Sequence, residues 1–133
     1  MANLNACGLS KAERIHSRLV VDQLFSSSNP SIAIYPLRTV WMISQHTADS
    51  PIPSVSMLIS VPKKRFHHAV DRNRVKRQVR EAFRLNKHIL NGKLQDGTRH
   101  IDIAFICIAD HLHDSRLVHK SVVKSLMRIA DSL

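Results

Sequence analysis

The sequence predicts a single domain of the α/β class, with elements in the order helix, strand, strand, strand, helix, strand, helix. A chain of 133 residues is long enough to bury one core. Hydrophobic residues make up 44% of it, which excludes wholesale disorder despite a net charge of +10. Apolar residues recur with helical spacing in three segments and with strand-like spacing between them. No internal repeat or long linker divides the chain.

The first helix has two possible starting points. Ser10 begins a Ser-x-x-Glu capping box, whereas Ser17 stands ahead of a stronger apolar stripe. Residues 26–30, which read Ser-Ser-Ser-Asn-Pro, stop this helix. A short strand is expected at 32–35 and a more strongly apolar one at 37–44.

The rest of the chain is more strongly patterned. Residues 54–61 alternate, which is typical of a strand with one buried and one more polar face. Asp71 is a suitable helix N-cap, apolar residues follow at helical spacing from 72 to about 90, and Gly92 stands in the usual terminating position. The nearly continuous apolar run at 101–109 predicts a strand covered on both faces. The stripe of a closing helix consists of Leu117, Val118, Val122, Leu126, Met127 and Ile129.

Positive charge is concentrated in one segment. Between Lys63 and Lys87, ten cations face only two carboxylates, so this segment carries +8 of the net +10. The cations are Lys63, Lys64, Arg65, Arg72, Arg74, Lys76, Arg77, Arg80, Arg84 and Lys87. Such a local concentration of one sign is expected where a polyanion docks, and it is typical of nucleic-acid binding.

The predicted central helix separates its apolar residues from most of its cations. At about 100° per residue, its apolar residues fall within an arc of ~100° and six cations fall within an adjoining arc of ~140°. The apolar set is Val75, Val79, Ala82 and Phe83, and the cationic row is Arg72, Lys76, Arg77, Arg80, Arg84 and Lys87. Arg74 lies outside this row. The alternative is a solvated face, but such faces usually carry acids at i,i+4 spacing, and only Glu81 is present.

The sequence does not support a membrane-spanning or a secreted protein. The longest uninterrupted apolar run, 103–109, is far shorter than the roughly 20 residues needed to span a bilayer. The N-terminal residues lack the charged start and apolar stretch of a secretory signal. Cys7 and Cys107 are too few for a disulfide framework or a thiolate metal site. We therefore expect a cytoplasmic protein without a membrane partner, forming one nucleic-acid-binding domain over 1–133 with residues 1–8 flexible.

A family resemblance lies in residues 64–84, which read KRFHHAVDRNRVKRQVREAFR. Its core is Arg72-Asn73-Arg74, followed by Lys76-Arg77, Arg80-Glu81 and Phe83-Arg84. This segment resembles the signature of the protein subunit of bacterial ribonuclease P. A generic basic helix would not reproduce an asparagine between two arginines together with the downstream spacing. The resemblance extends over most of the chain.

The resemblance implies a two-layer α/β (α+β) sandwich ordered α-β-β-β-α-β-α, with a mixed sheet of about four strands and an arginine-rich central helix. It implies the protein component of an endoribonuclease that removes the 5′ leader of precursor tRNA. Catalysis then belongs to a partner RNA that uses Mg²⁺, and the protein has no catalytic residue and no tightly bound metal. The implied partners are the catalytic RNA and precursor tRNA, with no obligate protein partner.

The resemblance also implies site residues. The family's basic motif falls on Arg72, Asn73, Arg74, Lys76, Arg77, Arg80 and Arg84, and the neighbouring Lys63, Lys64, Arg65 and Lys87 complete the predicted RNA-binding set. Phe25 and Trp41 match aromatic residues of a cleft for the single-stranded leader, where bases can stack on rings. Ordinary core packing is the alternative for both. The family usually has glycine where His67 stands.

Three alternatives remain compatible with parts of the sequence. His67 and His68 adjoin the basic motif and could serve as acid and base in a protein nuclease, although adjacent side chains point apart. The charge alone also fits a non-enzymatic RNA or DNA binder, such as a ribosome-associated protein. A structural metal site is the third alternative, with candidate ligands Asp110, His111, His113, Asp114 and His119.

Overall fold

The computed structural model describes residues 15, 18–26, 28–45, 55–94 and 99–133. The predicted flexibility of residues 1–8 and the possible helix caps at Ser10 and Ser17 lie outside the described residues. None of the described helices has the length and apolar character needed to cross a bilayer.

The secondary-structure elements follow the predicted order, with one short helix added after the central one. They are α1 (Arg18–Leu24), β1 (Ser31–Ile34), β2 (Leu37–Gln45), β3 (Val55–Ser60), α2 (Ala69–Asn86), α3 (His88–Asn91), β4 (Arg99–Cys107) and α4 (Ser115–Asp131). The strands form one mixed sheet in the order β1-β2-β4-β3. The strand β2 is antiparallel to β1 and β4, whereas β3 runs parallel to β4. The predicted α/β fold class is confirmed.

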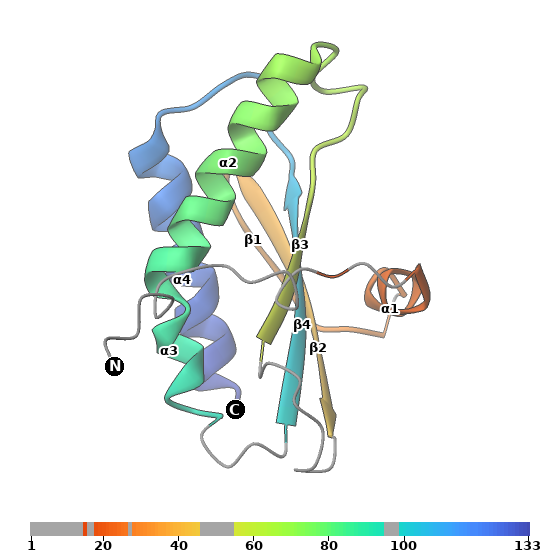
Figure 1. The fold of residues 1–133 in the computed structure, drawn as a ribbon, viewed down its shortest axis with the longest axis vertical. Coiled ribbons are helices and arrows are strands. Elements are labelled where there is room, and N and C mark those ends of the chain that lie inside the picture. Colours follow the sequence, from red (N-terminus) through yellow and green to blue (C-terminus); the bar gives the residue numbers. More distant parts are fainter. Residues whose placement is uncertain (1–14, 16–17, 27, 46–54, 95–98) are drawn as a thin grey trace, which may run out of the picture.

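The two faces of the sheet are covered unequally. In Figure 1, α2, α3 and α4 lie on one side of the sheet and α1 lies alone on the other. The α2–α4 side contains the larger core, where the rings of Phe83 and Phe105 meet edge to face with centroids 6.1 Å apart. The α1 side contains a smaller buried cluster of Leu24, Val40 and Ala104. The helical layer therefore anchors α2 firmly, while α1 covers only part of the opposite face.

Strand alternation decides which β2 side chains reach each face. Leu37 and Trp41 belong to the core beneath the helical layer, and Val40 belongs to the cluster on the α1 side. The partner strand β4 is buried on both faces, because residues 100–105 are all buried. This confirms the prediction of a strand covered on both sides.

A chain of buried hydroxyl groups ties α4 to the sheet. The Thr39 hydroxyl donates to Ser125 Oγ at 3.0 Å, and Ser125 Oγ donates to the carbonyl of Ser121 at 2.9 Å. Ser121 Oγ in turn donates to the carbonyl of Ile34 at 2.6 Å. Because each buried hydroxyl has a partner, none incurs the cost of an unmade hydrogen bond. These bonds fix α4 against β1 and β2.

The central helix begins earlier than predicted. Asp71 is not the N-cap: α2 starts at Ala69, His68 is the N-cap, and Asp71 lies in the first turn. A carboxylate in the first turn still interacts favourably with the helix dipole. Arg72 Nη1 donates to the carbonyls of Phe66 at 2.8 Å and His67 at 3.0 Å, which holds the turn before the helix. The N-cap of α2 therefore lies three residues before the predicted one.

Candidate nucleic-acid interface

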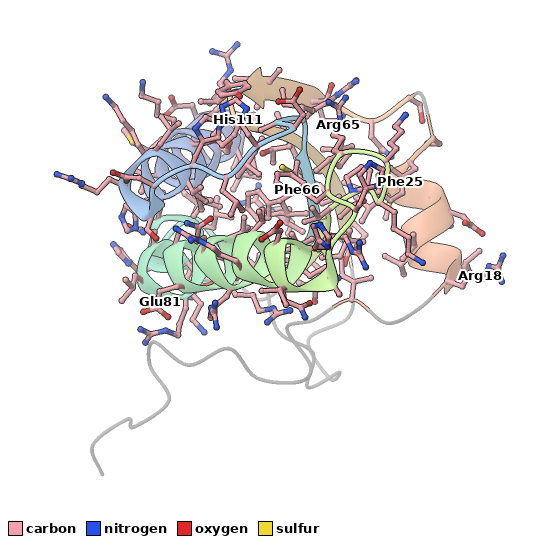
Figure 2. All side chains as sticks on the ribbon, turned by 90° about the horizontal axis from the view of Figure 1, so that it is seen from above. Arg18, Phe25, Arg65, Phe66, Glu81 and His111 are labelled. Carbon is pink, nitrogen blue, oxygen red and sulfur yellow. The ribbon has the colours of Figure 1, made fainter. Side chains whose placement is uncertain are left out.

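The outer surface of α2 carries most of the predicted cations. Arg74 and Arg77 are exposed, and Lys76, Arg80 and Arg84 are half-buried at the margins of that surface. Lys63, Lys64 and the motif residue Asn73 are also exposed. The inner face of the helix is held in the core by Val75, Val79, Ala82 and Phe83, as predicted. Figure 2 shows nitrogen-tipped side chains projecting from this helix into solvent.

Carboxylates neutralise little of this charge. Arg84 Nε donates to Glu81 Oε2 at 3.1 Å, and this hydrogen bond lowers the pKa of Glu81 below its usual value. Within the described part of the chain, Lys76, Arg77 and Arg80 have neither an ion pair nor a side-chain hydrogen bond. An exposed pair such as Arg84–Glu81 is weak. The α2 surface therefore keeps a strongly positive potential.

Two of the predicted RNA-binding cations donate hydrogen bonds to backbone carbonyls of the protein itself. Arg65 Nη1 donates to the carbonyl of Ile108 at 2.9 Å, joining the β3–α2 turn to the end of β4. Arg72 holds the turn before α2, as described above. No described residue other than glycine has a positive φ, so His67 does not adopt the left-handed conformation that glycine would favour. These contacts pre-order the start of the basic motif.

The prediction that Lys87 belongs to the exposed row is wrong. Only 7% of Lys87 is exposed. It lies between α2 and α3, where the expected single helix divides and Leu90 enters the core. Because the chain turns here, continuing the α2 helical wheel past Asn86 misplaces the side chain.

A small cleft lies between α1 and the sheet. It has a volume of about 250 Å³ and is lined by Leu24, Phe25, Ser26, Asn29, Ser31, Arg38, Val40 and Ile106. Phe25 is 47% exposed, as a residue that meets a ligand must be. Asn29 Nδ2 donates to the carbonyls of Gln23 and Leu24 at 2.6 and 3.1 Å, which fixes the end of α1 at the cleft edge. The cleft thus combines one available ring with a polar rim.

The prediction that Trp41 lines this cleft is wrong. Trp41 is 5% exposed and packs in the core on the opposite face of the sheet. Its neighbour Val40 lines the cleft instead, together with Arg38 two residues earlier. Successive residues of a strand point to opposite faces of the sheet. A prediction that is wrong by one position therefore places a core residue in the cleft. Arg38 is the candidate site residue that the sequence analysis did not identify. The alternation of side chains along β2 could have identified it, because Arg38 and Val40 point to the same face.

The histidine-rich segment after β4 does not gather into a metal centre. His111 Nδ1 pairs with Asp110 Oδ1 at 2.8 Å, and this hydrogen bond lowers the pKa of Asp110. His113 Nε2 lies 2.8 Å from the Tyr35 hydroxyl, and Asp114 caps α4 through the Arg116 amide at 2.6 Å. Among the described residues, no group of three or more histidine, cysteine or acidic side chains could hold a metal ion. The arrangement does not support the metal-site alternative.

The histidines next to the basic motif lack the geometry of an acid–base pair. His67 and His68 are both exposed. Within the described ranges, neither side chain has a hydrogen-bond partner that would orient its ring. Nothing in this geometry favours the protein-nuclease alternative.

Comparison with known proteins gives consistent similarities. Residues 9–130 match the family described as Ribonuclease P. A ribonuclease P protein component from Porphyromonas gingivalis is 47% identical over 127 residues, covering 95% of this chain and 89% of that protein. One from Chlorobium phaeobacteroides is 32% identical over 113 residues, covering 81% and 77% of the two chains. The Staphylococcus aureus RNase P protein structure has a TM-score of 0.64 at 24% identity, over 90% of this chain and 96% of that one, so the fold is shared.

Proposed function

Because the chain belongs to the ribonuclease P protein family, we propose that it binds a catalytic RNA and the 5′ leader of precursor tRNA, supporting endonucleolytic removal of the leader. In this proposal the partner RNA carries out the hydrolysis with Mg²⁺, and the protein contributes binding and positioning. Family membership supports the tRNA-processing complex, and the two surfaces described above support the division of labour.

The single observation that carries the proposal is the unneutralised charge on α2. Lys76, Arg77 and Arg80 share one outer surface with Arg74 nearby, and the helix beneath them is anchored in the core. Guanidinium groups grip phosphate oxygens bidentately and lysines add mobile positive charge. A structured RNA placed on this surface would have its phosphate repulsion screened at the point of contact.

The cleft beside α1 is suited to unpaired nucleotides. A base can stack on Phe25, whose ring is available to solvent, while Arg38 at the rim can meet a phosphate. Stacking tolerates any base, which suits leaders of varied sequence. Mature tRNA has no leader to occupy this cleft, so the cleft would favour precursor over product.

Magnesium belongs to the RNA in this proposal. We assign no Mg²⁺ ligand to the protein, whose contribution is to supply cationic charge where RNA strands approach one another. The protein should therefore matter most when magnesium is scarce.

Reconstitution tests the proposal directly. The candidate catalytic RNA of the same organism is assayed at low magnesium on precursor tRNA, with and without this protein. We expect cleavage at the mature 5′ end to require the RNA and to be strongly stimulated by the protein. Cleavage by the protein alone would instead favour the nuclease alternative, and no stimulation of any structured RNA would favour a non-enzymatic binder.

A further inference from the structure

A second row of cations runs along α4, outside the basic motif. Its members stand at every fourth position and are Arg116, Lys120, Lys124 and Arg128. With a rise of 1.5 Å per residue, successive members lie about 6 Å apart along the helix axis and drift only about 40° around it. All four are exposed, opposite the buried stripe that holds α4 in the core. The row therefore forms one continuous cationic strip on the solvent face of α4.

Little nearby negative charge balances the strip. Arg116 Nε lies 3.6 Å from Asp114 Oδ2, in a pair that is largely exposed. In the part of the chain that the structure describes, Lys120, Lys124 and Arg128 have neither an ion pair nor a side-chain hydrogen bond. Like charges at i,i+4 repel one another, so the spacing works against helix stability. A face that only promotes solubility would gain from mixed signs, whereas residues 116–128 contain no acid, and Asp114 and Asp131 stand only at the two ends of the helix.

An open hollow adjoins the strip, between the end of α2 and α4. Val123 and Met127 give it an apolar lining, and Arg116, Lys120 and Lys124 border it. Asn86 Nδ2 and His119 Nε2, also in the lining, lie within hydrogen-bond distance of each other at 3.2 Å. Met127 is 53% exposed. A nucleotide matches this pattern, because its phosphates can meet the lysines while its sugar or base covers the apolar atoms.

We propose that the solvent face of α4 is a second docking surface for the catalytic RNA subunit. The two helices pack side by side on the same face of the sheet, so a large folded RNA seated on α2 can extend onto α4 (Figures 1 and 2). The single-stranded leader is assigned to the opposite face, beside α1. This inference rests on the proposed function and extends its RNA-binding surface beyond the basic motif.

The test is a titration of catalytic RNA alone with the double variant Lys120→Ala/Lys124→Ala over a range of salt concentrations. Each phosphate contact contributes about −0.7 to −0.9 to the slope of log affinity against log salt. We expect the variant to bind more weakly and the slope to become shallower by about 1.5. The charge-conserving variant Lys120→Arg/Lys124→Arg should retain most of the affinity and most of the salt slope. Lys93 is an exposed lysine outside both cationic rows, so Lys93→Ala should behave as wild type.

An unchanged affinity and slope in Lys120→Ala/Lys124→Ala would overturn the inference. So would a variant that binds catalytic RNA normally but weakens precursor-tRNA binding by the assembled complex, because the strip would then face another molecule. An α2 variant, Arg77→Ala/Arg80→Ala, separates the two proposals. If it loses affinity while the α4 variant does not, only the α4 inference fails, and if neither loses affinity the proposed function fails as well.

Discussion

The surface of α2 and the cleft beside α1 differ in charge and in the aromatic side chain that each offers. The α2 surface is rich in cations that carboxylates leave largely unbalanced. The cleft is about 250 Å³ in volume, with an apolar floor and one arginine among its lining residues. Charge acts over a Debye length and responds to salt, whereas stacking acts only at contact. Under the proposed function, affinity and discrimination are therefore carried by separate surfaces of one small domain.

The largest expected effect concerns which aromatic residue belongs to the cleft. Trp41→Ala should destabilise the fold by about 3–5 kcal/mol, because it empties a site in the well-packed core. Denaturant unfolding measures this loss. A Trp41→Ala protein that is as stable as wild type but has lost its preference for precursor tRNA would show that Trp41 lines the cleft and not the core.

The next effect tests charge as the source of affinity. In Lys76→Ala/Arg77→Ala/Arg80→Ala, the salt slope for binding catalytic RNA should become shallower by about 2–3, because three phosphate contacts are lost. Filter binding at several salt concentrations measures it. The matched control Arg77→Lys/Arg80→Lys keeps the charge and should keep most of the slope. A triple variant with a wild-type slope would contradict the assignment of α2.

A smaller effect tests stacking as the source of discrimination. Phe25→Ala should reduce the preference for precursor over mature tRNA by roughly 5- to 150-fold, since one stacked base is worth about 1–3 kcal/mol. Affinity for catalytic RNA and the salt slope should hardly change. Ile43→Ala removes a similarly exposed apolar side chain outside the cleft and serves as the control. Equal losses on both tRNAs would show that Phe25 only packs.

The smallest effect concerns the one carboxylate paired on the α2 surface. Glu81→Gln should change the free energy of unfolding by no more than about 0.5 kcal/mol, because the pair with Arg84 is exposed. The pKa of Glu81 is lowered in the folded state, so the pair stabilises the protein above the unfolded-state pKa. That contribution is lost as the pH falls through the folded-state pKa. Unfolding measured from neutral to acid pH should therefore show the two proteins converging at low pH.

The same substitution, Glu81→Gln, should also affect RNA binding. Removing one negative charge from the α2 surface should slightly strengthen binding to catalytic RNA and leave the cleft's preference for precursor tRNA unchanged. A loss of affinity in Glu81→Gln would show that the carboxylate positions Arg84 for RNA rather than opposing it.

Most of the fold could be predicted because its signals are local. The alternation in β3, the continuous apolar run of β4 and the helical stripe of α4 each depend on side chains a few residues apart. The ends of elements were less predictable. The helix α2 has His68 as its N-cap with no side-chain capping bond, so the polar capping signal at Asp71 indicated a later start than the one observed.

The residues of the candidate site were likewise predictable only where the signal was local. The cations of α2 could be predicted as one surface because a helix repeats every 3.6 residues and the apolar stripe of that helix fixes its orientation. Lys87 was misplaced because the helical repeat breaks between α2 and α3. The α4 strip stands in the sequence as a four-residue repeat of cations, but its exposure on one solvent face follows from how α4 packs on the sheet.

The order of the strands and main helices and the basic surface of α2 follow from composition and short-range spacing in the sequence, and the family follows from the resemblance of the motif at residues 64–84. Only the tertiary structure decided that Val40 and Arg38, rather than Trp41, face the cleft beside Phe25. The two faces of a β-strand differ only in what packs on them. Which face receives α1 and which receives the helical layer depends on contacts between segments far apart in the chain.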